Sequence, residues 1–182
     1  MTTPSGYSRS DFPIIDMGDE DLQTLLEGFD DYSQKLILAI DPCWDASNRM
    51  QSVEYCLFLY GAALGIARGK QLDDEYCVAI FGPYLSRFMD WRISTPWLLQ
   101  CEAEMVKSHR LQGVRSAGAN TATAVILAGS QGRSDDLNSP RNMELLIQIF
   151  SELRKLIDDR EASDEHLFQA SGLLYDSVVG TT

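Results

Sequence analysis

The sequence predicts an all-α protein, a single-domain bundle of about six to seven helices with an extended N-terminal arm. Apolar residues recur at three- and four-residue intervals through most of the chain. At Ser139-Pro140 a capping hydroxyl precedes a proline suited to a first helical turn. The 182 residues, 45% of them hydrophobic and 23% charged, suit one globular core. We therefore expect an arm at 1–18 and one helical domain at 19–182.

The N-terminal region divides into two parts. Residues 1–18 mix Pro, Gly and Ser with a few apolar residues and lack a helical period, which predicts the extended arm. Leu, Ile and Phe then recur at helical spacing to about Asp41, where Pro42 follows. The acids that start with Asp19 suit the positive end of a helix dipole. This pattern predicts the first helix.

A second helix is expected from a cap at Ser47 to the region of Gly69. Within it Gly61, Gly65 and Gly69 are four residues apart. Glycines at this spacing form dimerisation faces in membranes, but the apolar run at 55–67 is shorter than the roughly 20 residues that span a bilayer. We favour a groove for another helix of the same domain, although the sequence does not separate an internal partner from an external one.

The middle of the chain predicts two more helices. One begins at Asp73, ends at about Trp91 and is kinked or broken near Pro83. The next begins at Thr95-Pro96 and continues to about Ser116. Its expected inward stripe is Leu98, Cys101 and Met105.

The region Gly118–Asn138 is ambiguous, because it contains residues with strand propensity. A single strand without a partner cannot form a sheet, so we expect a helix that ends near Gly129 and then a loop. Two amphipathic helices follow, from Ser139-Pro140 and from Ser163. Their expected inward residues are Met143, Leu146, Ile147, Phe150, Leu153 and Ile157 in the first, and Leu167, Ala170, Leu174 and Val178 in the second.

The stretch VILAGSQGRS at 125–134 resembles the end of a strand running into a phosphate-binding loop. A Walker loop requires a glycine five residues before its final Gly-Lys-Ser/Thr, and Leu127 occupies that position. The lysine is replaced by Arg133, and helix signals resume only at Ser139. We therefore expect an exposed glycine loop at a protein contact, without a nucleotide or another cofactor.

Metal and nucleophile chemistry have little support in the sequence. The four cysteines form no CxxC pair, and neither His109 nor His166 follows a Glu-x-x pattern as in di-iron bundles. The G-x-S-x-G nucleophile motif is also missing. We therefore expect no metal, no cofactor and no catalytic constellation.

An aromatic cluster offers an alternative, in which a small-ligand protein or enzyme has a pocket near two tryptophans. Glu102 and His109, seven residues apart, would share a helix face there as an acid/base pair. Such clusters are more often part of the core. The candidate pocket residues are Tyr84, Phe88, Trp91 and Trp97.

The charge distribution is uneven. The net charge is -12, and the first 45 residues hold ten acids and two bases. Met105 to Arg133 contains no acid. Its basic side chains could hold a phosphate, an acidic peptide or nucleic acid. We favour the other interpretation, in which they pair with acids of the same fold or face solvent. The candidate residues are Lys107, His109, Arg110, Arg115 and Arg133.

These observations favour a non-catalytic protein-interaction module, such as an adaptor, chaperone, inhibitor or immunity-type protein. The acidic charge predicts a basic protein partner, and a homo-oligomer is also possible. We expect no direct nucleic-acid or membrane binding and, because the N-terminus lacks a signal-peptide pattern, a cytoplasmic location. The first alternative to this function is the small-ligand protein or enzyme described above, and the second alternative is an acidic nucleic-acid mimic.

Overall fold

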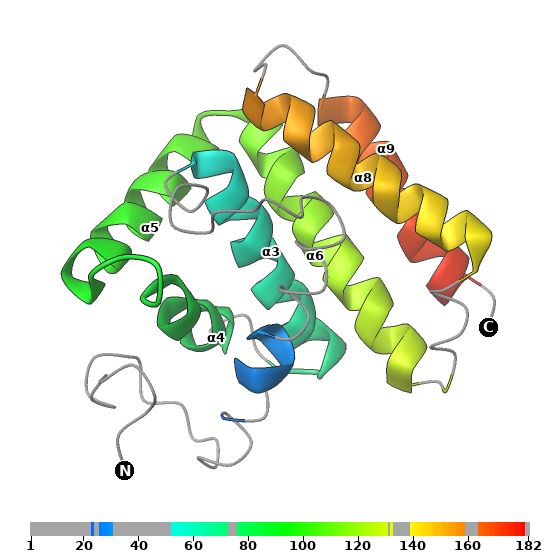
Figure 1. Cartoon of the computed structure of the whole chain (residues 1–182), viewed down its shortest axis with the longest axis horizontal. Helices are drawn as coiled ribbons and strands as arrows, with labels where there is room; N and C mark the ends of the chain where they lie inside the picture. The colour runs from blue at the N-terminus through cyan, green and yellow to red at the C-terminus, as the bar shows by residue number, and fades with distance from the viewer. Residues whose placement is uncertain are drawn as a thin grey trace.

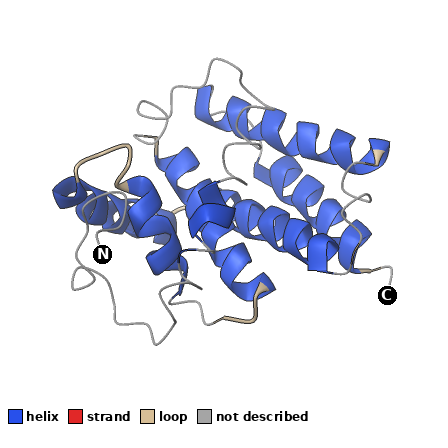
Figure 2. Ribbon diagram, turned by 60° about the horizontal axis from the view of Figure 1, so that its bottom comes forward, coloured by secondary structure: helices blue, strands red, loops and turns tan. Residues whose placement is uncertain are grey.

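The computed structural model describes residues 23, 26–30, 52–72, 76–130, 132, 139–158 and 164–180. These residues form a single all-helical bundle (Figures 1 and 2), so the predicted fold class is confirmed. The arm predicted at 1–18 lies outside the described residues, and of the predicted first helix only Gln23 and 26–30 are described. The helices with defined bounds are α3 (Val53–Gly69), α4 (Tyr76–Leu85), α5 (Trp91–Val106), α6 (His109–Ser130), α8 (Pro140–Asp158) and α9 (Asp164–Val179).

α3 is the central helix of the bundle. Every residue from Glu54 to Ala67 is buried, so α3 has no solvent-facing side over most of its length. A helix that is apolar all round must be covered on all sides. Figure 1 shows α3 between α5 and α6, with α4 at one end of the group.

α3 and α6 approach so closely that their backbones are in contact, because glycines lie where the two helices meet. A Cβ added to Gly61, Gly65 or Gly118 would lie inside contact distance of a carbonyl oxygen of the opposite helix. These distances are 2.0 Å from Gly61 to Arg115 O, 2.2 Å from Gly65 to Ala119 O, and 2.0 Å from Gly118 to Phe58 O.

The boundaries around α5 differ from the prediction. The predicted helix start at Thr95-Pro96 is wrong, because both residues lie inside α5, which begins at Trp91. Asp90 is the true cap, since its carboxylate accepts the backbone N–H of Arg92 at 2.8 Å. Pro96 is tolerated close to this end of the helix, at the expense of one backbone hydrogen bond. Pro83 lies inside α4, which ends shortly after it at Leu85.

The predicted continuation of this helix to Ser116 is also wrong. α5 ends at Val106, and α6 begins at His109. The amide of Gln112 donates to the carbonyls of Met105 at 3.3 Å and Val106 at 3.4 Å. These bonds satisfy the last acceptors of α5 and stabilise a tight corner between the two helices.

The ambiguous region is helical from Gly118 to Ser130 and forms the second half of α6. The predicted helix is therefore confirmed, and its end lies one residue beyond Gly129. The strand-favouring threonines fit because their hydroxyls bond backbone carbonyls one turn earlier. Thr121 donates to Ala117 O at 2.8 Å, and Thr123 to Ala119 O at 2.8 Å.

α8 and α9 begin where the capping signals predict, at Pro140 and Asp164. The inward residues predicted for α9, Leu167, Ala170, Leu174 and Val178, are all buried. In α8 the prediction is partly wrong, because Met143 is 38% exposed and Ile147 is 65% exposed. The face of α8 that contacts α9 includes the buried Asn142 instead. The Oδ1 atom of Asn142 accepts a hydrogen bond from the Ser177 hydroxyl at 2.9 Å. Among the side chains of α8 that the structure describes, which do not include Ile157, the buried ones are Asn142, Ile149, Phe150, Leu153 and Leu156.

Candidate functional site

The predicted basic residues do not gather into one exposed patch. Lys107 and His109 are exposed at the corner between α5 and α6, while Arg115 is half-buried on α6. Arg133 lies outside the described residues. Arg110 points into the bundle, where it contacts two other helices. The corner therefore presents Lys107 and His109 to solvent, without Arg110.

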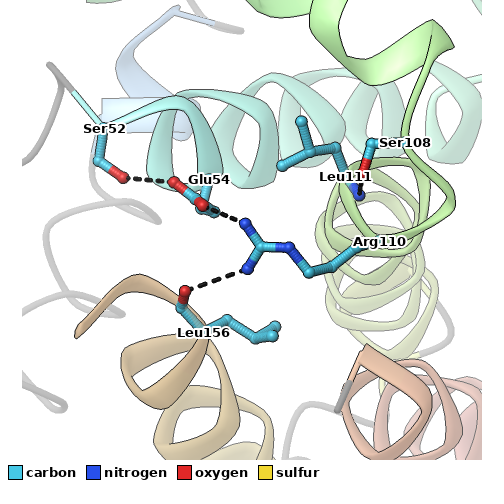
Figure 3. Close-up of polar contacts among 6 residues, drawn as sticks. All are labelled: Ser52, Glu54, Ser108, Arg110, Leu111 and Leu156. Carbon is cyan, nitrogen blue, oxygen red and sulfur yellow. Dashed lines mark hydrogen bonds and ion pairs between the residues drawn. The ribbon is translucent and has the colours of Figure 1, made fainter. Parts of the chain in front are cut away.

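Arg110 joins α6 to the first turn of α3 and the last turns of α8 (Figure 3). Its Nη2 forms an ion pair with the carboxylate of Glu54. Its Nη1 donates to the carbonyl of Leu156 at 3.1 Å. The Ser52 hydroxyl donates to the second carboxylate oxygen of Glu54 at 3.0 Å. One guanidinium thus connects three helices through directed hydrogen bonds.

This pair lies at the edge of the core. The side chain of Glu54 is 10% exposed and that of Arg110 is 26% exposed. A carboxylate this deeply buried is costly unless a charged partner compensates it, and Arg110 does so. The structure therefore uses Arg110 within the fold, and the acid that pairs with it belongs to α3.

The structure does not show the four candidate pocket residues lining one pocket. Tyr84 is buried, and its ring centroid lies 5.1 Å from that of half-buried Phe88 in an edge-to-face contact. Trp97 is partly buried against the core, and the side chain of Trp91 lies outside the described residues. Tyr84 and Phe88 therefore pack in an aromatic core.

The proposed acid/base pair is not on one helix. Glu102 lies on α5, whereas His109 is exposed at the start of α6, so the expected shared helix face is wrong. Glu102 instead interacts with Tyr60 of α3, whose hydroxyl also accepts the Cys77 thiol at 3.4 Å. Burial, and then the bond with Cys77, raises the pKa of Tyr60. Tyr60 is therefore a neutral hydroxyl at physiological pH.

Two cysteines meet where α3 faces α5. A hydrogen bond between the thiols of Cys56 and Cys101, followed by burial, raises the pKa of Cys56, while a bond from the Trp97 indole opposes the shift. Both thiols are fully buried. Because the nucleophilic form of cysteine is the thiolate, this environment makes Cys56 a packing group and a poor nucleophile.

Among the described residues, no group of three or more His, Cys, Asp or Glu side chains has a metal-binding arrangement. Within the same residues, no helix has both the length and the apolar character needed to cross a membrane.

The structure adds a surface that the sequence reasoning missed, on the side of α5 that faces away from α3. We call it the α5 outer face, and it consists of Pro96, Leu99, Ala103 and Val106. Leu99 is 60% exposed and Val106 is 72% exposed. The signal was present, since the four residues repeat at three- and four-residue spacing opposite the inward stripe of Leu98, Cys101 and Met105.

Comparisons of the chain with protein-family models, with curated proteins and with solved structures find no match.

Proposed function

We propose that this protein is a non-catalytic protein-interaction module and that the α5 outer face is its contact surface. The observation that carries the proposal is the exposure of two large aliphatic side chains, Leu99 and Val106, on one face of one helix. Contiguous exposed apolar residues are typical of surfaces that bind other proteins.

The opposite face of α5 explains why this surface is suited to binding. Leu98, Cys101 and Met105 are all buried and fix the helix to the bundle. Binding therefore requires little ordering of the backbone, which reduces the entropy cost of association. A rigid helix with aliphatic side chains fits a complementary apolar groove or helix on the partner.

The partner is proposed to be basic because of where the negative charge lies. The described residues contain 12 acids and 10 bases, a difference of two, whereas the whole chain has a net charge of -12. The other residues hold the remaining 15 acids and 5 bases, a net charge of -10, and the largest share lies in the acidic first 45 residues. Negative charge on the chain would accelerate encounter with a basic protein, while the apolar contact at the α5 outer face slows dissociation.

The experiment that tests the proposal captures partners with the wild-type chain and with Leu99→Glu at low salt, followed by mass spectrometry. We expect the substitution to abolish capture of a specific partner and to change the free energy of unfolding by no more than about 0.5 kcal/mol, because the side chain is exposed. Ile147→Glu on α8 is the matched control, since Ile147 is 65% exposed on a different helix. Equal capture by Leu99→Glu and Ile147→Glu would reject the α5 outer face as the binding surface.

A further inference from the structure

Two free cysteines face each other at the contact between α3 and α5. Cys56 belongs to α3, Cys101 belongs to the inward stripe of α5, and both side chains are fully buried. Their thiols are joined directly by a hydrogen bond. Neither thiol belongs to the α5 outer face, which lies on the opposite side of the helix. The pair therefore has no part in the contact surface proposed above.

Neighbouring contacts hold the two helices in the register at which the thiols meet. Trp97, one turn before Cys101, also forms a side-chain hydrogen bond with Cys56. Tyr60, one turn after Cys56, interacts with Glu102. Glu102 directly follows Cys101 in the chain. Polar contacts from both helices thus lie beside the pair, and the meeting of the two sulfur atoms belongs to the packing of α5 on α3.

Cys77 on α4 provides a comparison within the same molecule. Its side chain is also buried, but its thiol donates to the hydroxyl of Tyr60 at 3.4 Å. Burial in the core therefore does not by itself direct a thiol toward another sulfur atom. The thiol-to-thiol contact distinguishes Cys56 and Cys101 from this equally buried cysteine, and Cys77 is a matched control for any reaction of the pair.

We propose that Cys56 and Cys101 are a reversible dithiol–disulfide pair, which a peroxide oxidises to a covalent link between α3 and α5. One sulfur first attacks a peroxide oxygen. An S–O bond forms, the O–O bond breaks, and the released oxygen leaves as water. The second sulfur then attacks the sulfenic sulfur. An S–S bond forms, the S–O bond breaks, and the hydroxyl leaves as water with the second thiol proton. The two thiols lose two electrons, and one peroxide gains them.

The packing determines how this pair reacts. The attacking form of a cysteine is the thiolate, so a buried pair reacts slowly with peroxide, in agreement with the poor nucleophilicity of Cys56. The second step is favoured because the partner sulfur is already in contact with the sulfur that becomes sulfenic acid. Capture by the neighbour protects that sulfur from irreversible oxidation. The pair thus responds to sustained oxidising conditions and does not act as a catalytic thiol.

The disulfide would change the stability of the bundle. It would connect position 56 to position 101, which is 45 residues later in the chain. A link across a loop of this kind stabilises a protein mainly by constraining its unfolded state. It would also fix α5 to the central helix, so that α5 could no longer separate from α3 by local unfolding. This inference depends on the thiol contact alone and is independent of the partner proposed for the α5 outer face.

The test treats the folded wild-type chain with hydrogen peroxide, blocks the remaining thiols with iodoacetamide and maps the tryptic peptides by mass spectrometry without reduction. Trypsin cuts after Lys and Arg and places the four cysteines in four different peptides, residues 36–49, 50–68, 71–87 and 93–107. We expect 50–68 to be linked to 93–107, and dithiothreitol to separate them. The proposal is wrong if these two peptides stay unlinked, or if either is linked to 71–87 to the same extent.

Urea unfolding measures the effect of the link on stability. Peroxide-treated wild type should unfold at a higher urea concentration than the untreated chain, and dithiothreitol should reverse the shift, whereas methionine sulfoxide requires its own reductases. Cys77→Ala should keep the shift, and Cys101→Ala should lose it. An equal shift in Cys101→Ala would assign the effect to another oxidation and overturn the proposal. The peptide map uses the wild-type chain, so it is decisive even if a variant does not fold.

Discussion

The α3–α6 interface and the α5 outer face use apolar residues in opposite ways. In the α3–α6 interface, glycines bring two backbones together, and α3 is covered on every side. On the α5 outer face, large aliphatic side chains remain exposed on a helix whose other face is buried. Small residues thus mark a contact within the fold, whereas the large exposed residues mark the surface that we propose for a separate partner.

The two regions should also differ in what they tolerate. A single added carbon at Gly65 would lie 2.2 Å from a carbonyl oxygen, and the backbone cannot move away without separating the helices. Leu99 has open surroundings, and its whole side chain can be exchanged without a steric clash.

Gly65→Ala should give the largest loss of stability. We expect the free energy of unfolding to fall by about 3 kcal/mol or more, because overpacking here forces two backbones apart. Urea unfolding followed by circular dichroism measures the change. Gly172→Ala on α9 is the control, since a Cβ there meets no atom within 4 Å, and it should stabilise the protein by about 0.5 to 1 kcal/mol. Equal effects of the two substitutions would show that the α3–α6 interface can relax.

Arg110→Ala should have the second largest effect. It leaves the carboxylate of Glu54 buried without its charged partner, and we expect a loss of about 2 kcal/mol, less than for a fully buried pair because Arg110 is partly exposed. Adding Glu54→Gln should recover part of the loss. Lys155→Ala, which removes a 58% exposed partner from Glu152 of the same helix, should cost less than Arg110→Ala in the same urea experiment. A small effect of Arg110→Ala would mean that water replaces the guanidinium.

Raising the pH should have the smallest effect on the free energy of unfolding, through Cys56 at the contact between α3 and α5. The pKa of Cys56 is raised in the folded state, so above the ordinary thiol value of about 9 the unfolded chain loses this proton while the folded chain keeps it. The contribution of Cys56 to stability is therefore fully present below pH 9 and is lost above it, by up to about 1.4 kcal/mol per pH unit. Urea unfolding from pH 8 to 10 measures the slope, which should be flatter in Cys56→Ala. Parallel pH profiles would show that Cys56 ionises in the folded protein.

The sequence predicted much of the fold because local signals and the final packing agree. Ser139-Pro140 predicts a helix start, and α8 begins there in the structure. The four residues predicted to face inward on α9 are likewise buried. The prediction was wrong at Thr95-Pro96, where Asp90 provides an earlier cap that the proline signal concealed. It was also wrong at the corner after Val106, which depends on bonds from Gln112 to the preceding carbonyls.

The candidate functional surface and the role of Arg110 were harder to predict, because they depend on which residues other elements cover. Arginine is usually a surface residue, so the sequence does not suggest that Arg110 points into the bundle. Its partner there, Glu54, is 56 residues earlier in the chain. The aromatic partners of Phe29 likewise come from α4, far along the sequence. Periodicity places a residue on one side of a helix, but it does not identify the element that covers that side.

The glycines of the α3–α6 interface also constrain how this sequence can evolve. Mutations of buried aliphatic residues can be compensated by neighbours of complementary volume, whereas no side-chain change makes room for a Cβ against a carbonyl oxygen. Divergent descendants of this fold should therefore keep Gly61, Gly65 and Gly118 long after their other core residues have changed. The spacing of these three glycines is a signature by which distant homologues can be sought.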